Sequence, residues 1–561
     1  MTILTVDNLV TQFFTRSGVV TAVDGVSFDI KRGEIVGLVG ESGSGKSVTG
    51  FSLLGLVDQP GRVTSGSIRL GGEELVGKSD RDMRAIRGAR IAMVFQDPLM
   101  TLNPVITIGA QMRLAIRAHG AVSRRAADER AAEFLTKVGI REARARLSAY
   151  PHEFSGGMRQ RVAIAIALLL GSELIVADEP TTALDVSIQA QILDEVRELA
   201  AESGTALLWI SHDLAVVASL ASRVLVMYRG KIVETGPTSK VLAAPQHAYT
   251  AGLLASLPAM ATPGTPLSVF RPETMTVERP EPVALPPSPS AGQPFVTVTN
   301  AVKHFVPSRT LGDKIAAKIT ANPGQPTVKA VDGVSLTIAK GETLGLVGES
   351  GSGKSTLGRM IAGILAPTSG TVTMDGAPVM EGGRKAGTRI QTVFQDPFAS
   401  LDPRMRVGDI VAEGPLAHGL TNKSDRVAYV AGHLSRAGLD PGLATRFPHQ
   451  FSGGQRQRIA IARALAMQPE VLVCDEPVSS LDVSIQAQII NLFLELKRDL
   501  NLTILFISHD LSVVRHLSDR IAIMLNGRIV EEGITETVYE TPQDDYTKRL
   551  LAAVPKLSAA A

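Results

Sequence analysis

The sequence contains one series of motifs twice, and this internal repeat limits the fold more than any other feature. GLVGESGSGKS occurs at 37–47 and again at 345–355, and FQDP, FSGG, LDVSIQAQI and ISHDL follow it in the same order in both halves. The two FSGG motifs begin at 154 and 451, so they lie 297 residues apart, and the later motifs keep this spacing. A constant offset predicts two copies of one domain, with insertions and deletions confined to the first part of the copy.

The domain boundaries that we expect follow from the repeat and from the prolines. We predict a first domain at 1–257, a Pro-rich linker at 258–294, a second domain at 295–555 and a short tail at 556–561. The linker contains ten of the chain's 31 prolines. Because proline lacks an N–H and has a fixed φ, this segment is expected to be extended and semi-rigid rather than helical.

Composition excludes several classes of function. The 561 residues include 57 Lys and Arg against 55 Asp and Glu, whereas dedicated nucleic-acid-binding proteins carry a strong basic excess, so we expect no nucleic-acid partner. The single cysteine, Cys474, can form neither an internal disulfide nor a four-cysteine metal centre, and it fits a reducing compartment. We expect no secretory signal, and the most apolar run, 162–171, is too short to cross a bilayer. Any membrane role would therefore come through partners.

Each copy contains a candidate phosphate-binding loop. Short β-branched runs alternate with helical stretches, which predicts an α/β fold with ligands at the carboxyl ends of buried strands. At one strand–helix junction in each copy the sequence fits G-x-x-x-x-G-K-[ST], a loop whose backbone N–H groups surround phosphate oxygens. Lys46 and Lys354 would reach the β- and γ-phosphates, and Ser47 and Ser355 would bind Mg²⁺. The other predicted loop residues are Gly40, Ser42, Gly43, Ser44 and Gly45 in the first copy and Gly348, Ser350, Gly351, Ser352 and Gly353 in the second.

Two adjacent acids end a predicted buried strand in each copy. They are Asp178 and Glu179 in the first copy and Asp475 and Glu476 in the second. Neighbouring carboxylates at a strand end are unfavourable unless a cation or a proton is shared nearby. We expect Asp178 and Asp475 to orient the Mg²⁺ shell and Glu179 and Glu476 to polarise the attacking water. The alternative is a structural cap at the end of each strand.

Gln96 and Gln395, both in FQDP, and His212 and His509, both in ISHD, repeat as well. A glutamine offers both a donor and an acceptor, which suits a residue that bridges a metal to a water molecule. Each histidine lies at the same distance in sequence from the acids, which favours contact with the γ-phosphate over a role as a core residue.

FSGGMRQR at 154–161 and FSGGQRQR at 451–458 resemble the signature motif of the ATP-binding-cassette (ABC) ATPases. The resemblance extends to the phosphate loops, glutamines, acids and histidines, and covers nearly the whole chain outside the linker. It implies two P-loop NTPase cassettes, each with a mixed sheet core, a helical subdomain and an antiparallel β part. In that family two cassettes pack head to tail with ATP between the phosphate loop of one and the signature motif of the other, so the fused repeat would be an intramolecular dimer.

On this resemblance the signature turns bind the nucleotide held by the opposite copy. Ser452, Gly453, Gly454 and Gln455 would face the first phosphate loop, and Ser155, Gly156 and Gly157 would face the second. Met158 of the first copy stands where the second copy has Gln455, and a methionine cannot hydrogen-bond to ribose or phosphate as a glutamine can. Val48 likewise stands where the second copy has the hydroxyl of Thr356. Both sites are nevertheless expected to hydrolyse ATP. Adenine should stack on Phe13 and Phe305, which could equally be core or surface aromatics.

The phrases GESGSGKS and DEPTTALDVSIQAQIL and the tails PQHAYTAGLL and PQDDYTKRLL are similar to those of ATPases from bacterial dipeptide and oligopeptide importers. That similarity implies ATP and Mg²⁺ as cofactors, two integral-membrane permease subunits and an extracytoplasmic solute-binding protein as partners, and the cytoplasmic face of the membrane as location. Peptide is the expected cargo, with nickel, glutathione or glycosides as alternatives. The alternative function is that of a ribosome-associated tandem cassette. Proteins of that class have a long, charged, helical linker, whereas the linker of this chain is Pro-rich.

Overall fold

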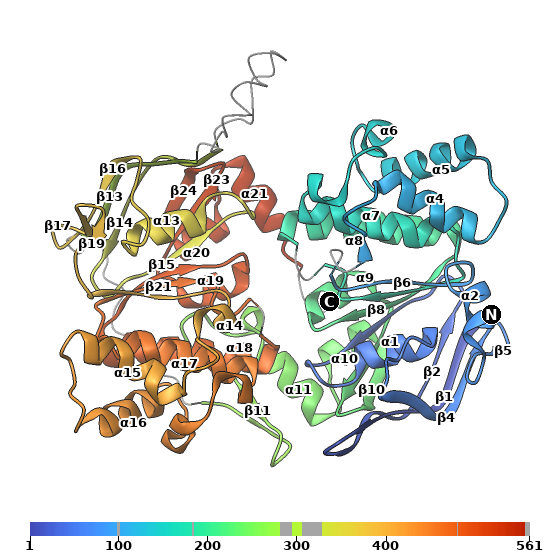
Figure 1. The fold of residues 1–561 in the computed structure, drawn as a ribbon, viewed down its shortest axis with the longest axis horizontal. Helices are drawn as coiled ribbons and strands as arrows, with labels where there is room; N and C mark the ends of the chain where they lie inside the picture. Colours follow the sequence, from blue (N-terminus) through green and yellow to red (C-terminus); the bar gives the residue numbers. More distant parts are fainter. Residues whose placement is uncertain (98–100, 182–183, 281–293, 306–327, 480, 556–561) are drawn as a thin grey trace. The chain divides into compact units, whose positions relative to one another are not determined.

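The chain forms two compact units in the computed structural model, which describes residues 1–97, 101–181, 184–280, 294–305, 328–479 and 481–555. The first unit comprises residues 1–254 and 270–277 together with the C-terminal residues from 553. The second comprises residues 255–269 and 278–552. Figure 1 traces the first repeat from blue to green and the second from yellow to red.

The first unit contains an antiparallel sheet and a mixed sheet. The antiparallel sheet has the order β2 (Gly18–Lys31), β1 (Thr2–Thr15), β4 (Gly61–Leu70) and β5 (Glu73–Glu74). The mixed sheet has the order β10 (Lys231–Pro237), β9 (Arg223–Tyr228), β3 (Ile35–Val39), β8 (Ala206–Ser211), β7 (Leu174–Asp178) and β6 (Ile91–Val94). All neighbours in the mixed sheet are parallel except β10, which pairs antiparallel with β9.

The second unit repeats this topology. Its antiparallel sheet has the order β14 (Val328–Ala339), β13 (Pro294–Phe305), β16 (Ser369–Met374) and β17 (Ala377–Pro378). Its mixed sheet has the order β20 (Ile390–Val393), β21 (Val471–Asp475), β22 (Thr503–Ile507), β15 (Thr343–Val347), β23 (Arg520–Leu525) and β24 (Arg528–Ile534). A small hairpin of β18 (Met380–Glu381) and β19 (Arg384–Lys385) is added. The predicted α/β class with an antiparallel part is thus confirmed in both halves.

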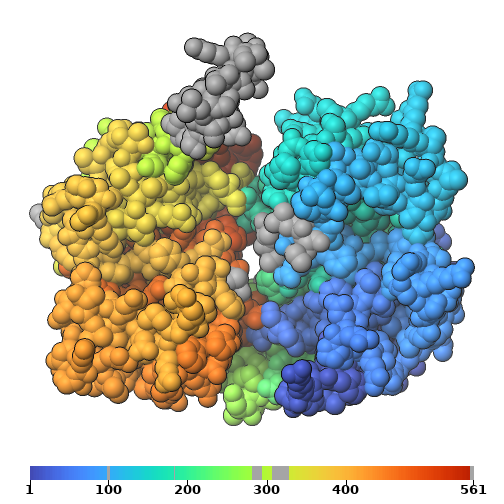
Figure 2. All heavy atoms as spheres, viewed as in Figure 1, coloured from blue at the N-terminus to red at the C-terminus, as the bar shows by residue number. Residues whose placement is uncertain are grey.

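The helices of the two units correspond to one another as the strands do. A helix follows each phosphate loop, α1 (Lys46–Leu54) and α13 (Lys354–Ile361). A helical part occupies the middle of each repeat, and Figure 2 shows it at the surface of its unit, light blue to cyan in the first and orange in the second. Its main helices are α4 (Ile108–Ala118), α5 (Arg124–Lys137) and α7 (Gly156–Leu169) in the first unit and α15 (Val407–Ala417), α16 (Arg426–Arg436) and α17 (Gly453–Leu465) in the second.

Three further helices in each repeat follow the strand-end acids, follow the histidine motif and form the tail. They are α8 (Val186–Ser203), α9 (Leu214–Leu220) and α11 (Ala248–Ala255) in the first repeat and α18 (Val483–Leu500), α19 (Leu511–Leu517) and α21 (Asp545–Ala552) in the second. No helix in the described part of the chain is both long and apolar enough to span a membrane.

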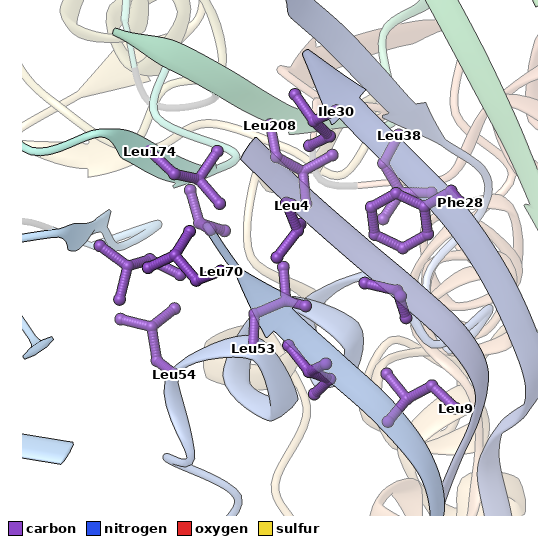
Figure 3. Packing of buried hydrophobic residues seen from close by; sticks show 14 of the residues in the cluster. Leu4, Leu9, Phe28, Ile30, Leu38, Leu53, Leu54, Leu70, Leu174 and Leu208 are labelled. Atoms are coloured by element: carbon purple, nitrogen blue, oxygen red, sulfur yellow. The ribbon is translucent and has the colours of Figure 1, made fainter. Parts of the chain in front are cut away.

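Continuous apolar runs in the central strands place the core between the two sheets of each unit. Every residue of β7, β8, β21 and β22 is buried, as expected for parallel strands covered on both faces. Figure 3 shows the first core, where Leu4 and Phe28 of the antiparallel sheet, Leu53 of α1 and Leu208 of the mixed sheet pack together. Each such side chain contributes about 1.5–3 kcal/mol by leaving water. The core therefore fixes α1, and with it the loop that precedes α1.

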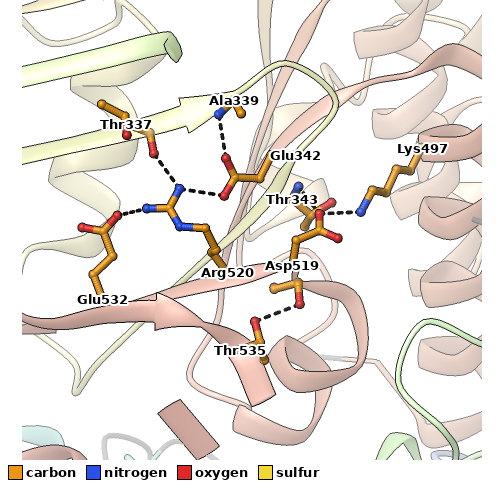
Figure 4. Close-up of polar contacts among 10 residues, drawn as sticks. Thr337, Ala339, Glu342, Thr343, Lys497, Asp519, Arg520, Glu532 and Thr535 are labelled. Carbon is orange, nitrogen blue, oxygen red and sulfur yellow. Dashed lines mark hydrogen bonds and ion pairs between the residues drawn. The ribbon is translucent and has the colours of Figure 1, made fainter. Parts of the chain in front are cut away.

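Paired charges hold the start of the strand that leads to the second phosphate loop. Glu342, which is almost fully buried, accepts a hydrogen bond of 2.8 Å from Arg520 Nη1 (Figure 4). Beside it, Asp519 Oδ2 accepts bonds from Lys497 Nζ at 2.6 Å and from the N–H of Thr343 at 2.7 Å. Because each buried charge has an opposite partner, the network fixes β15 against β23 without an uncompensated charge.

Part of the segment that we expected to be an extended linker is ordered. Residues 258–260 form a short 3₁₀ helix, and β11 (Val269–Arg271) pairs with β12 (Thr276–Glu278). Apolar residues between the prolines explain the order, because Leu267 is fully buried and Phe270 is almost fully buried. Residues 281–293, the most proline-rich part of the predicted linker, and the predicted tail at 556–561 lie outside the described residues.

Candidate nucleotide site

The glycines of each phosphate loop allow close approach of backbone to backbone. A Cβ on Gly40 would lie 2.2 Å from the carbonyl oxygen of Met227, and a Cβ on Gly348 would lie 2.1 Å from that of Met524. Gly45 and Gly353, with φ of 103° and 107°, cap the helices that follow, α1 and α13. No residue with a side chain fits these positions without strain. The loop therefore wraps tightly at the N-terminus of a helix, where N–H groups and the helix dipole favour an anion.

The loop lysines and two buried hydroxyls supply the polar lining. Lys46 Nζ donates to the carbonyls of Gly40 at 2.7 Å and Glu41 at 2.9 Å, and Lys354 Nζ makes the equivalent bonds. The hydroxyls of Ser44 and Ser352 are buried and have no hydrogen-bond partner among the described residues. Buried hydroxyls without partners are unfavourable, so a phosphate oxygen in the loop would satisfy them. The loops fit a phosphate chain.

A serine and an aspartate meet beside each loop. Ser47 Oγ donates to Asp178 Oδ1 at 3.0 Å, and Ser355 Oγ donates to Asp475 Oδ1 at 2.8 Å. Burial, aided by the neighbouring glutamate charge, raises the pKa of Asp178 to about 6 and also raises the pKa of Asp475. A divalent cation at this point would remove the unfavourable burial of the carboxylate charge. Hydroxyl and carboxylate oxygens are the ligand types that Mg²⁺ prefers.

The protein atoms alone do not complete a metal site. In the part of the chain that the structure describes, no group of three or more His, Cys, Asp or Glu side chains could hold a metal ion. Mg²⁺ characteristically takes one or two carboxylate ligands together with substrate phosphates and water. The pairs Ser47–Asp178 and Ser355–Asp475 fit that kind of site.

The second acid of each pair contacts both the glutamine and the histidine. In the first unit Glu179 accepts from Gln96 Nε2 at 3.0 Å and lies 3.1 Å from His212 Nδ1. In the second unit Glu476 accepts from Gln395 Nε2 at 2.9 Å and lies 3.2 Å from His509 Nδ1. Three motifs that are far apart in the sequence thus converge at the carboxyl end of β7 in the first unit and of β21 in the second.

The backbone and the charge of these acids are both unusual. Glu179 and Glu476 have φ of 45° and 48°, a region that residues other than glycine rarely adopt. Strain of this kind is concentrated at functional sites. Burial opposes ionisation of Glu476, but its hydrogen bond to His509 and the charge of His509 outweigh burial and lower the pKa of Glu476. The pKa values of His212 and His509 are raised, because the bond to the acid outweighs their own burial.

Each signature turn is the N-terminus of a helix. Ser155 caps α7 and accepts from the N–H of Met158 at 3.3 Å, and Ser452 caps α17 in the same way. Gly156 and Gly453 are exposed, whereas Gly157 and Gly454 pack against isoleucines. The side chain of Gln455 accepts the N–H of Ser452 at 3.1 Å, so within its own unit it completes a capping box that Met158 cannot form.

The candidate adenine-stacking residues lie in strands whose partner strands lead towards the phosphate loops. Phe13 of β1 pairs with Val20, and Phe305 of β13 pairs with Val328. In the first unit Val20 lies two residues before Ala22, whose carbonyl oxygen lies close to where a Cβ on Gly45 would project. In the second unit Val328 stands in the same relation to Ala330 and Gly353. Phe13 is partly buried and Phe305 is exposed, and stacking on adenine remains a prediction for both. Val48 packs against the core of the first unit, and its counterpart Thr356 is half-buried.

Sequence reasoning missed one residue in each unit that reaches the phosphate loop. The N–H of Glu41 donates to the hydroxyl of Tyr249, and the N–H of Glu349 donates to that of Tyr546. The available signal was the repeated Pro-Gln-x-x-Tyr-Thr motif in the tails of the two copies.

Comparison with known proteins identifies the family. A family model described as ABC transporter matches residues 23–182 and 331–479, and a model described as oligopeptide/dipeptide transporter, C-terminal region, matches residues 233–282 and 530–561. Glutathione import ATP-binding protein GsiA of Pectobacterium atrosepticum is 46% identical over 566 residues, covering 99% of this chain and 89% of that protein. The protein of the same name from Escherichia coli K12 is 45% identical with the same coverage.

Solved structures are similar to part of this chain. A dimeric post-hydrolysis state of the ATP-binding cassette MJ0796 bound to ADP and Pi is 28% identical, covers 42% of this chain and 99% of that chain, and has a TM-score of 0.39. The structure of cbiO1 from Clostridium perfringens is 30% identical, covers 44% of this chain and 91% of that chain, and has a TM-score of 0.37. Because the family model matches more than half of the chain and the relatives match nearly all of it, this chain belongs to the ABC transporter ATPases and carries two cassettes with the C-terminal region of the oligopeptide and dipeptide transporters.

Proposed function

We propose that the chain binds two ATP molecules with Mg²⁺, hydrolyses them, and uses the energy to import a peptide through two separate permease subunits. The observation that carries the proposal is the duplicated arrangement at the strand ends. In both units a phosphate loop, a Ser–Asp pair and a strained glutamate held by glutamine and histidine lie together. A regulatory pair of cassettes would need to have lost a catalytic acid, and both acids are present.

The chemistry assigned to each site is attack of water on the γ-phosphorus of ATP. The new P–O bond forms as the bond to the ADP oxygen breaks, and the proton of the water passes to Glu179 or Glu476. His212 and His509 contact these acids and would orient them towards the γ-phosphate. The bound cation would offset charge on the phosphate oxygens, while the loop N–H groups and lysines hold the phosphates.

The signature turns would complete each site from the opposite cassette. Gly156 and Gly453 are exposed and begin α7 and α17. The N–H groups at such a helix N-terminus would suit a γ-phosphate. Ser155 and Ser452 cap those helices, so the turn geometry is already formed. With two ATP molecules bound the cassettes would close, and hydrolysis would let them reopen, which is a two-state element biased by the γ-phosphate.

A groove in the second unit suits docking of a permease segment. It has a volume of about 910 Å³ and is lined by side chains of β20, α15 and α17, including Phe394, Ile410 and Arg463. Phe394 directly precedes Gln395, which contacts Glu476. A segment bound in the groove would therefore lie close to the hydrolytic centre. We infer that the permease-coupling surface of the second unit lies around residues 396–411, which include Ile410 of the groove, and that its counterpart in the first unit lies around 97–112.

The cargo follows from the relatives and the tail region. The relatives are named for import of glutathione, which is itself a small peptide, and the tails match the C-terminal region of oligopeptide and dipeptide transporters. We therefore infer a peptide cargo, delivered by an extracytoplasmic solute-binding protein, with glutathione as the first compound to test. On this account the chain lies peripherally on the cytoplasmic face of the membrane, held by the permeases.

Purification from the host membrane tests the proposal. A tagged chain extracted in mild detergent is expected to bring down two hydrophobic subunits. In nanodiscs, the ATPase rate of that complex should rise when the solute-binding protein is loaded with glutathione or a dipeptide, and should not rise with Ni²⁺ or a glycoside. Recovery with ribosomal proteins instead of membrane subunits would contradict transport, and stimulation by Ni²⁺ or a glycoside alone would contradict the peptide cargo.

A further inference from the structure

The two repeats end in a tail motif that the nucleotide chemistry above does not use. The motif Pro-Gln-x-x-Tyr-Thr occurs at 245–250 and at 542–547, and its tyrosines, Tyr249 and Tyr546, lie in α11 and α21. A tail helix is an unexpected place for a residue that contacts a phosphate loop. Tyr249 lies 208 residues from its loop partner in sequence, and Tyr546 lies 197 residues from its partner.

Each tyrosine hydroxyl accepts a hydrogen bond from the first peptide group of a phosphate loop. The N–H of Glu41 donates to Tyr249 Oη at 2.9 Å, and the N–H of Glu349 donates to Tyr546 Oη at 3.1 Å. The carbonyl of the same Gly40–Glu41 peptide accepts Lys46 Nζ at 2.7 Å. The peptide is therefore held at both its N–H and its C=O, which fixes the direction in which the loop begins.

The tail helix that carries the tyrosine is itself anchored to the mixed sheet. Glu234 of β10 accepts from the N–H groups of Gln246 at 2.7 Å and His247 at 3.1 Å, just before α11. Burial opposes ionisation of Glu234, but the nearby polar side chain of Thr250 and these two bonds outweigh it and lower the pKa of Glu234. An ionised acceptor at this position holds the start of α11 firmly.

The second unit repeats the anchor at matching positions. Glu531 of β24 accepts from the N–H groups of Gln543 at 2.8 Å and Asp544 at 3.1 Å. Burial again opposes ionisation, but the nearby polar side chain of Thr547 and these two bonds outweigh it and lower the pKa of Glu531. Both copies of the motif thus use backbone N–H groups to secure the start of the tail helix and a tyrosine to reach the phosphate loop.

Packing leaves the tyrosine little freedom. Tyr249 is fully buried, with its ring 4.3 Å from that of Tyr228 and 5.4 Å from that of Phe270. Tyr546 is also buried, although less completely. A rigid ring with a hydroxyl aimed at one peptide group is a fixed support rather than an incidental contact.

We propose that Tyr249 and Tyr546 are positioning residues of the two ATP sites, which hold the first peptide of each phosphate loop in the conformation that binds phosphate. The proposal rests on the assignment of the ATP sites made above. It gives the family-specific tail a role in nucleotide affinity. It also means that a displacement of α11 or α21 would weaken ATP binding at the loop that the helix supports.

The test removes the hydroxyls and keeps the rings. In the full-length chain with Tyr249→Phe and Tyr546→Phe, loss of one hydrogen bond per site should raise the KM for MgATP and the Kd for a fluorescent ATP analogue by about 3–10-fold. The kcat should stay within about twofold, because the bond is made equally before and during the reaction. Hydrogen exchange of the peptides that contain Glu41 and Glu349 should accelerate as well. A loss of folded protein would lower kcat and leave KM unchanged.

Tyr228→Phe is the matched control. Its ring lies in the same aromatic cluster, but its hydroxyl has no hydrogen-bond partner among the described residues, so KM should not change. An equal rise in KM in this control would overturn the proposal, because the effect would then not depend on a hydrogen bond to the phosphate loop.

Two further outcomes separate this proposal from the site assignment on which it rests. If Lys46→Ala and Lys354→Ala abolish ATP binding while the Tyr→Phe chain keeps its normal KM and normal amide exchange, the ATP sites stand and the role of the tyrosines is wrong. If the lysine variants bind ATP normally, the site assignment fails and the tyrosine proposal fails with it.

Discussion

Adding one methyl group to the exposed glycine of each signature turn probes the surface that is proposed to meet the γ-phosphate. Gly156 and Gly453 are the first residues of α7 and α17. A Cβ on Gly156 would meet no atom within 4 Å, and a Cβ on Gly453 would meet only Leu481 Cδ2 at 4.0 Å. Neither glycine has a positive φ. Alanine is therefore accommodated at both positions in the folded chain.

The expected effect on stability is small and favourable. Replacing glycine by alanine where the backbone is compatible stabilises a protein by about 0.4–1 kcal/mol, because the unfolded chain loses conformational freedom. The neighbouring glycines behave differently, since a Cβ on Gly157 would lie 3.1 Å from Ile188 and a Cβ on Gly454 would lie 2.2 Å from Ile485. Overpacking of that kind costs about 1–3 kcal/mol. Alanine at the first glycine of each turn therefore tests function, whereas alanine at the second would also disturb folding.

The assay is steady-state ATP hydrolysis with a parallel thermal melt. The Gly156→Ala and Gly453→Ala chain should melt at or slightly above the wild-type temperature and lose at least about tenfold in ATPase rate, a loss of about 1.4 kcal/mol in transition-state stabilisation. Gly432→Ala in α16 is the control, because a Cβ there also meets nothing within 4 Å and the site is remote in sequence from every nucleotide motif. A normal rate in the double variant would refute the reasoning, because no phosphate could then approach these turns.

Two more predictions concern stability. Gln455→Met removes the bond to the N–H of Ser452 and should cost the second unit about 0.5–1 kcal/mol in urea unfolding, whereas Met158→Gln should gain the first unit a similar amount; equal midpoints would show that the capping box does not contribute. Burial lowers the pKa of His516 below its ordinary value of 6.5, against an opposing bond to the Thr265 carbonyl. The unfolded chain thus binds a proton that the folded chain does not, and the free energy of unfolding should fall as pH drops below about 6.5, by up to about 1.4 kcal/mol per pH unit for this residue. Melts between pH 7.5 and 5.5 should show a smaller decrease for His516→Gln, and an unchanged slope would contradict the assignment.

The strand–loop–helix units were predictable because their signals are local. The GLVG run before each glycine-rich loop predicted β3 and β15, and the apolar run before Asp178 and Asp475 predicted β7 and β21. The convergence of glutamine, glutamate and histidine could be expected from parallel strands that end at one edge of a sheet. Its detail could not, because the positive φ of Glu179 and Glu476 depends on tertiary contacts that the sequence does not display.

Two features needed the folded structure. The prolines between 258 and 294 predicted an extended linker, but Leu267 within it is buried, and its N–H and C=O both bond to the side chain of Asn491 at 2.7 and 2.8 Å. At that position the first repeat has Asp194, so the contact depends on the identity of one residue in the second repeat. The support of the phosphate loop by Tyr249 was equally hidden, because it joins residues that are 208 positions apart.

The most direct test of the central claim is the fate of ATP in the chain with Glu179→Gln and Glu476→Gln. Glutamine keeps the shape of each side chain but cannot accept the proton of water, so hydrolysis should fall by about 10²–10⁴-fold. After gel filtration with radiolabelled ATP, two unhydrolysed nucleotides should remain bound per chain. Substantial turnover in this variant, or retention of fewer than two ATP molecules, would contradict the account of two hydrolytic sites built on these acids.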